Sequence, residues 1–179
     1  ATQTGVEALA PAKLNLTLEL AGRRPDGFHE LRTVLVGLRL FARLRIAPAP
    51  PEGEPGDATA FATAGGAAGS LRLTRLAGGG TAVRADASNL VVRALDRLAE
   101  AASRPLRAAI TLVKAIPSRA GWGGGSSDAA ATLVAGERAG GLRRGAEKLL
   151  ALAAELGSDV PFFVSLLLGQ GRAALGEGR

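Results

Sequence analysis

One segment, residues 116–130, constrains this chain more than any other. It reads Ile-Pro-Ser-Arg-Ala-Gly-Trp-Gly-Gly-Gly-Ser-Ser-Asp-Ala-Ala, so four of the five positions from Gly121 to Gly125 are glycine. A backbone without side chains can approach an anion closely. The segment follows a predicted strand, Ala108–Ala115, and precedes a helix that we expect Ser126 or Ser127 to open. Because free N–H groups point out of a helix N-terminus, this strand–loop–helix unit is suited to binding polyphosphate.

The serine hydroxyls after the glycines add a second kind of ligand. They can donate hydrogen bonds to phosphate oxygens or bind Mg²⁺. The segment matches neither G-x-x-x-x-G-K-[ST] nor a dinucleotide G-x-G-x-x-G, because no lysine follows the glycines and no downstream acidic residue is evident. A flexible turn with an ordinary serine N-cap therefore stays open as the alternative. A second glycine cluster, Gly78–Gly80, shows how weakly glycines alone point to a site.

The N-terminal part of the chain is predicted to be rich in strands. Residues Ala12–Leu20 alternate between a polar face that carries Lys13 and Asn15 and a face of leucines. This period of two is typical of a half-buried strand, so we expect the leucine face to be the buried one. After a turn at Arg23–Gly27, residues 28–38 and 39–47 are predicted to form one or two further strands, and residues 71–76 a short one. The Pro-, Gly- and Ala-rich segment Pro48–Gly69 is expected to be a flexible hairpin loop or insertion.

The second half of the chain is predicted to be mainly helical. Ser88 or Asn89 is expected to cap a helix that runs to Ala102. The helix after the glycine loop is expected to end at Gly140–Gly141, and a further helix, Arg143–Leu156, is expected to end at Gly157. Strands and helices together predict the α+β class.

Composition narrows the classes of function. The chain has 179 residues, a length typical of one to two domains, and its 47% apolar and 21% charged residues are ordinary for a soluble globular protein. Its formal net charge is +6, and a basic surface favours anionic partners. Because the arginines are scattered and tyrosine is absent, nucleic acid is not expected as a partner. The sequence has no cysteine and no apolar segment of membrane-spanning length. Its first residues lack a basic region followed by an apolar run, so no signal peptide is expected. We therefore expect a cytoplasmic protein without membrane contact.

Single polar residues say little in isolation. On its strand, Lys13 would ordinarily be a solvated edge charge. Asp159, between Gly157-Ser158 and Val160-Pro161, would ordinarily be a helix cap or turn former. His29 is the only histidine and would ordinarily be structural or solvated. Without paired histidines or clustered carboxylates, no metal site made of protein ligands alone is expected.

Taken together, these segments resemble the GHMP kinase superfamily. The matching motifs fall in the order of that family, and they are Pro11–Leu16, Arg24–Leu31, Asn89-Leu90 with Val92–Ala94, Lys114 with Ile116-Pro117, Gly121–Ala130, and Leu156-Gly157 with Asp159–Phe163. The resemblance implies a GHMP kinase N-terminal domain, in which helices pack on a mixed sheet and a glycine-rich phosphate loop lies at a helix N-terminus.

The resemblance also implies a reaction. The branch with an Asp-Gly-aromatic-His-Glu-Leu turn transfers the γ-phosphoryl group of ATP, with Mg²⁺, to the 2-hydroxyl of 4-diphosphocytidyl-2-C-methyl-D-erythritol, in non-mevalonate isoprenoid biosynthesis. Asp159 would be the catalytic base or the carboxylate that orients the hydroxyl, and Lys13 would lie beside it. Asn15, Phe28 and His29 would bind this substrate.

The same resemblance assigns residues to ATP. Those that would border the adenosine or hold the phosphates are Asn89, Leu90, Lys114, Pro117, Gly121, Gly123, Gly124, Gly125, Ser126 and Ser127. The chain departs from the family pattern in having Phe28 in place of tyrosine, Leu35 in place of phenylalanine and Trp122 in place of a smaller apolar residue.

Length is a further departure from the family, whose members continue for about another hundred residues. We therefore expect residues 1–179 to be the N-terminal ATP-binding domain, with the C-terminal GHMP domain outside this chain. Another GHMP small-molecule kinase, or a non-catalytic nucleotide-binding fragment, stays open as an alternative, and so does a homodimer.

Overall fold

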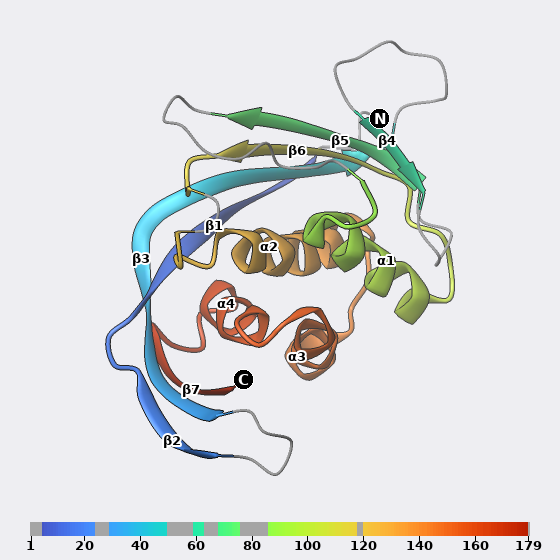
Figure 1. Ribbon diagram of the computed structural model, residues 1–179. Coiled ribbons are helices and arrows are strands. Elements are labelled where there is room, and N and C mark those ends of the chain that lie inside the picture. Colours follow the sequence, from blue (N-terminus) through green and yellow to red (C-terminus); the bar gives the residue numbers. More distant parts are fainter. Residues whose placement is uncertain are drawn as a thin grey trace.

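The fold is a curved mixed sheet with four helices packed on its inner face (Figure 1). The computed structural model describes residues 5–23, 29–49, 59–62, 68–75, 86–117 and 120–178. Within them the elements are β1 (Val6–Asn15), β2 (Glu19–Arg23), β3 (His29–Pro48), β4 (Thr59–Ala62), β5 (Ala68–Arg75), α1 (Leu90–Ala102), β6 (Ala108–Lys114), α2 (Gly124–Ala139), α3 (Gly145–Leu156), α4 (Val160–Leu167) and β7 (Ala173–Gly178). The predicted α+β class is confirmed.

Strand β3 is the central strand of the sheet, with which four other strands pair. The sheet order is β1-β3-β6-β5-β4, and β2 and β7 also pair with β3. One or two strands were expected between residues 28 and 47, and β3 is one strand of 20 residues. All of its partners are antiparallel to it, whereas β5 and β6 pair in parallel across the connection through α1. β3 bends so that its first residues, with β2 and β7, curve round under α4 (Figure 1).

Helix α2 lies in the middle of the helical layer and is buried over most of its surface. Its residues from Ala129 to Gly136 are almost all alanine, glycine or other small residues, so neighbouring elements can approach it closely. A Cβ on Gly136 would lie 2.8 Å from Leu98 Cδ1 of α1. The core around α2 contains side chains from the sheet and from the other helices. Its largest fully buried side chains include Leu44, Ile46, Leu95, Leu98, Ile110, Leu112 and Phe163, together with Leu133 of α2 itself.

The predicted orientation of the first strand is wrong. Leu14, Leu16 and Leu18 are 43%, 59% and 66% exposed, whereas Lys13 is only 7% exposed. The pairing of β1 with β3 is irregular between Pro11 and Ala12, and the face that lies inward changes near this point. Alternation in the sequence therefore separated the two faces correctly but could not say which one faces the core.

Several element boundaries also differ from expectation. The first strand begins at Val6 and ends at Asn15, and β2 follows as a separate strand. Helix α2 begins at Gly124, before either serine, and β7 was not predicted. Within the predicted insertion Pro48–Gly69, the described residues include β4 and the start of β5, which pair as an antiparallel hairpin. The flexibility expected there concerns residues outside the described part of the chain.

The helix predictions hold well. Asn89 caps α1 through its side chain, which accepts a hydrogen bond from the N–H of Val91. Gly140 and Gly157 are the C-cap residues of α2 and α3, as expected. Among the described residues, no helix combines the length and the apolar character needed to cross a membrane.

The reversed face of β1 predicts unequal costs for two leucine substitutions. Leu44→Ala should lower the free energy of unfolding by about 2–5 kcal/mol, because Leu44 is 1% exposed and its removal leaves a cavity. Leu14→Ala should change it by less than about 0.5 kcal/mol, because Leu14 is exposed. Urea unfolding of both variants measures the difference, and a large loss for Leu14→Ala would contradict the described orientation.

Candidate functional site

The glycine loop joins the end of β6 to the start of α2. Gly121 and Gly123 have φ values of +75° and +69°, which L side chains rarely adopt, so both positions favour glycine. Gly123 is the N-cap residue of α2 and has no side chain to cap the helix. The carbonyl of Gly123 accepts a hydrogen bond from the N–H of Ser127 at 2.8 Å, which closes the first helical turn. The amides before Ser127 have no acceptor inside the helix and face the loop, as an anion site requires.

The loop is held against β1 and α4 by its main chain. The N–H of Lys13 donates to the carbonyl oxygen of Trp122 at 3.0 Å. A Cβ on Gly123 would lie 2.7 Å from Phe163 Cζ and 3.0 Å from Lys13 Cγ. Since nothing larger than glycine fits there without displacement, β1, the loop and α4 meet at this point. The side chain of Trp122 is 37% exposed, so the loop is held in place by the Trp122 carbonyl and not by this side chain.

Lys13 and Asp159, from distant parts of the sequence, form an ion pair beside this loop. Lys13 Nζ lies 3.4 Å from Asp159 Oδ2, and the Lys13 side chain is 9% exposed against 33% for Asp159. Lys13 Nζ also donates to Asn15 Oδ1. Lys13 is therefore not a solvated edge charge. Asp159 occupies the N-cap position of α4, but its side chain makes no capping hydrogen bond, and this leaves the carboxylate directed at Lys13 and partly open to solvent.

The start of α1 lies next to the start of α2. A Cβ on Gly125 would be 3.6 Å from Leu90 Cδ1, so Leu90 borders the glycine loop. Asn89 directly precedes it as the N-cap of α1. The structure thus brings Asn89 and Leu90 together with the loop, although about 30 residues separate them in the chain.

The two serines differ in accessibility. Ser126 is half-buried, whereas Ser127 is fully buried and its Oγ has no hydrogen-bond partner in the described structure. Ser126 is therefore the hydroxyl that a bound phosphate can reach without a change in the helix. Pro117, at the other end of the loop, is exposed.

Asp128 is a site residue that the sequence analysis did not single out. It accepts a hydrogen bond from Lys114 Nζ, and the two residues are 3% and 7% exposed. Burial raises the pKa of Asp128 to about 6, and Lys114 opposes that rise. Asp128 is ionised at neutral pH, so the pair is a buried ion pair. The sequence did contain a feature that could have identified Asp128. A carboxylate at the start of an alanine-rich, buried helix requires a hydrogen-bond or ion-pair partner.

Two predicted substrate-binding residues cannot be placed by side chain. Phe28 lies outside the described residues, and only the backbone of His29 is described, as the first residue of β3. Lys13 pairs with Gly37, eight residues further along β3, so His29 lies up to about 26 Å from that point along the strand. The bend in β3 shortens this separation in space (Figure 1). Asn15, the third residue of this group, is part of the Lys13 cluster.

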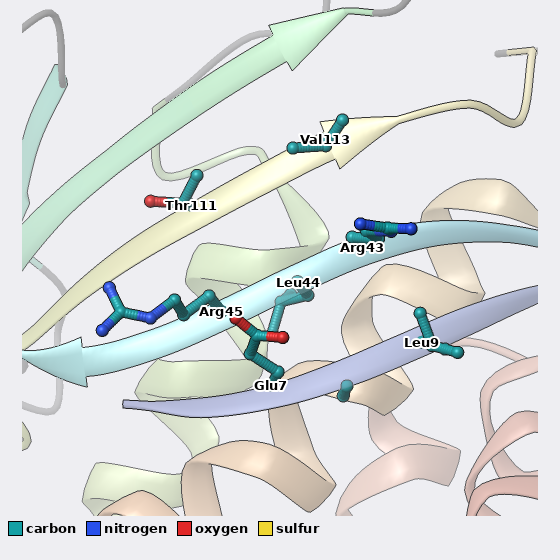
Figure 2. A pocket seen from close by; sticks show the side chains of 8 residues that line it. Glu7, Leu9, Arg43, Leu44, Arg45, Thr111 and Val113 are labelled. Carbon is teal, nitrogen blue, oxygen red and sulfur yellow. The ribbon is translucent and has the colours of Figure 1, made fainter. Parts of the chain in front are cut away.

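A hollow also lies on the outer face of the sheet, away from the helices (Figure 2). It has a volume of about 390 Å³, and its lining includes Glu7, Leu9, Arg43, Arg45, Thr111 and Val113. None of the predicted site residues lines it. In the described part of the chain, no group of three or more His, Cys, Asp or Glu residues could hold a metal ion.

The raised pKa of Asp128 predicts a pH dependence of stability. Between about pH 4 and pH 6 the folded state binds a proton at Asp128 that the unfolded state has lost, so the free energy of unfolding should fall as pH rises, by roughly 1–3 kcal/mol. Asp128→Asn should lack this component. Urea unfolding of the wild type and of Asp128→Asn at pH 4, 5 and 6 gives this component as the difference between their free energies of unfolding. A difference that grows with pH instead would mean that attraction by Lys114 outweighs burial.

Comparison with known proteins agrees with this arrangement. The sequence profile described as the GHMP kinases N terminal domain matches residues 89–165, which run from the cap of α1 into α4. Over 170 residues the chain is 43% identical to 4-diphosphocytidyl-2-C-methyl-D-erythritol kinase of Pseudomonas putida (strain W619), covering 94% of this chain and 50% of that protein. The enzyme of the same name from Salinispora arenicola (strain CNS-205) is 40% identical over 169 residues, covering 94% and 46%.

Solved structures show the same relationship. A crystal structure of 4-(cytidine 5'-diphospho)-2C-methyl-D-erythritol kinase superposes with a TM-score of 0.65 at 38% identity and covers 96% of this chain and 52% of that one. Homoserine kinase from Cytophaga hutchinsonii, at 18% identity and a TM-score of 0.57, shares the fold. The chain spans about half the length of the curated relatives it matches. The chain carries the fold of the GHMP kinase N-terminal domain.

Proposed function

We propose that the chain is the ATP-binding part of a kinase that phosphorylates the 2-hydroxyl of 4-diphosphocytidyl-2-C-methyl-D-erythritol, a step in non-mevalonate isoprenoid biosynthesis. The observation that carries the proposal is the Lys13–Asp159 pair, 3.4 Å apart, next to the glycine loop. Relatives about 40% identical over nearly the whole chain bear the name of this kinase. The proposal covers residues 1–179 as an N-terminal ATP-binding domain, active in the cytoplasm.

The chemistry asks mainly for positioning and charge stabilisation. Asp159 would accept a hydrogen bond from the acceptor hydroxyl and receive its proton as the hydroxyl oxygen bonds to the γ-phosphorus. The bond from that phosphorus to the β–γ bridging oxygen breaks, and ADP leaves with the electron pair. Lys13, held by Asn15, would orient Asp159 and stabilise negative charge that develops near the acceptor oxygen. The 33% exposure of Asp159 leaves room for the acceptor.

The residues round the loop fit a nucleoside triphosphate. The amides at the start of α2 and the half-buried hydroxyl of Ser126 would hold phosphate oxygens, with Gly121, Gly123, Gly124 and Gly125 keeping side chains out of the way. Asn89 and Leu90 would border the adenosine, because they lie beside Gly125. Pro117 would border the phosphates at the exposed end of the loop.

Magnesium would come with the nucleotide, since Mg²⁺ usually binds substrate phosphates and few protein ligands. It would neutralise phosphate charge, and the half-buried hydroxyl of Ser126 is the protein group suited to touch it. Phe28 and His29 are assigned to the cytidine part of the substrate by the family resemblance.

A non-catalytic nucleotide-binding fragment is the second candidate. The observation that favours it is the glycine loop beside the start of α1, which could bind a nucleotide whether or not turnover follows. The two candidates make different predictions for turnover but the same prediction for nucleotide binding.

ADP release should separate them. With the cytidylyl substrate and Mg²⁺-ATP, a kinase releases ADP, and Asp159→Ala should lower that rate by about 100-fold or more while nucleotide affinity stays within about threefold. Glu155→Ala, which removes an exposed carboxylate on α3, is the matched control and should keep the wild-type rate. Release of ADP that Asp159→Ala does not change would contradict the catalytic assignment. Saturable binding without turnover would favour the fragment.

Gly125→Ala tests where the phosphates lie. The added Cβ meets only Leu90 Cδ1 at an ordinary 3.6 Å, so the fold should accept it, and the helix should gain up to about 1 kcal/mol. The same Cβ stands on the exposed face of the loop and should weaken binding of a non-hydrolysable ATP analogue by about tenfold, measured by calorimetry. Unchanged affinity would place the phosphates elsewhere. Gly123→Ala should instead lower stability, because Phe163 occupies the space.

A further inference from the structure

The glycine loop rests on an ion pair whose members lie at its two ends. Lys114 is the last residue of β6, and Asp128 lies in the second turn of α2. Their side chains are 7% and 4% exposed, and Lys114 Nζ donates to Asp128 Oδ2. The pair therefore ties the strand before the loop to the helix after it, inside the protein.

The ammonium group of Lys114 lies directly against the start of α2. Lys114 Nζ is 3.4 Å from the position of a Cβ on Gly124, and Ile116 Cγ2 is 3.1 Å from the same position. Gly124 is the first residue of α2, so its amide is one of those that would receive phosphate. Lys114 thus brings a positive charge beneath the phosphate-binding amides, while its burial keeps it from a solvent-exposed ligand.

The Lys114–Asp128 ion pair would contribute little if its only role were to stabilise the fold. A buried ion pair loses the hydration of both charges, and an apolar pair of similar volume is often at least as stable. A cation near a helix N-terminus is also unfavourable, because the helix dipole is positive there. Both the buried ion pair and the cation near the helix N-terminus lie directly beneath the loop that would bind an anion. A bound anion would be attracted by Lys114, so the position of this cation would then become favourable.

Unsatisfied polar atoms mark the same turn. Asp128 Oδ1 and Ser127 Oγ are buried and have no hydrogen-bond partner in the described part of the chain. Each such atom costs stability. The Oδ2 contact with Lys114 is therefore what holds the Asp128 carboxylate, and through it the first turns of α2, in place relative to β6.

We propose that Lys114 and Asp128 are positioning residues that set the conformation of the phosphate loop through their buried ion pair, without touching the nucleotide themselves. The proposal rests on the proposed function, because it assigns the loop to ATP phosphates. It gives Lys114 a role different from direct contact with the adenosine.

The test separates positioning from stability. Lys114→Met/Asp128→Leu removes both charges and keeps apolar volume, so its denaturant midpoint should stay near or above that of the wild type. Asp128→Asn alone, which keeps Lys114 next to an uncharged side chain, is measured beside it. Arg97→Gln/Glu100→Gln, which removes the exposed ion pair of α1, is the matched control. Two quantities are measured for each folded protein: amide hydrogen exchange of residues 120–127 without ligand, and calorimetric affinity for a non-hydrolysable ATP analogue with Mg²⁺.

The double variant should show loop amides that exchange about tenfold faster and an affinity about 10- to 100-fold weaker, with the control unchanged. Wild-type exchange in the double variant, or faster exchange with unchanged affinity, would overturn the positioning role. A wild-type chain that binds no nucleotide would contradict the proposed function instead, and the exchange measurement would still decide whether the pair sets the loop.

Discussion

The hydrogen bond from the Lys13 amide to the Trp122 carbonyl is the contact on which the site depends. It joins the first strand to a loop more than a hundred residues later, and it does so through main chain, so the identity of Trp122 matters little to it. Gly123 makes the contact sterically possible, because any side chain there would strike Phe163 and Lys13. Once β1, the loop and α4 meet, Lys13 and Asp159 must lie side by side.

The small residues of α2, like Gly123, allow neighbouring elements to approach one another closely. A helix buried on most sides can carry few bulky side chains, and its alanines and glycines let α1, α4 and the sheet approach closely. The N-termini of α1 and α2 consequently lie together, with Leu90 next to Gly125. The central helix thus brings a candidate adenosine contact and a candidate phosphate contact to one place.

Charge is distributed unevenly around this centre. Lys13 and Asp159 form a partly exposed pair that can receive a substrate, whereas Lys114 and Asp128 form a buried pair that cannot. The exposed pair suits chemistry and the buried pair suits support of the loop. The family resemblance grouped Lys114 with the nucleotide ligands, and the exposure of the partner carboxylate, 33% for Asp159 against 4% for Asp128, is what distinguishes the two pairs.

Local sequence alone determined much of this protein. The helix ends at Asn89, Gly140 and Gly157, the strand Ala108–Ala115 and the glycine loop before a helix all followed from capping, period and glycine geometry. These features depend on near neighbours in the chain, so residue patterns suffice to find them. Motif order added the family and, with it, the pairing of Lys13 with Asp159.

Tertiary structure decided the rest. The inward face of β1 is decided by packing against other elements, which alternation does not reveal, and β7 forms only because the chain returns to β3. The burial of Ser127 and the Lys114–Asp128 pair depend on how α2 sits on the sheet. In each case the deciding contact joins residues far apart in the sequence, so its energy exists only in the folded chain.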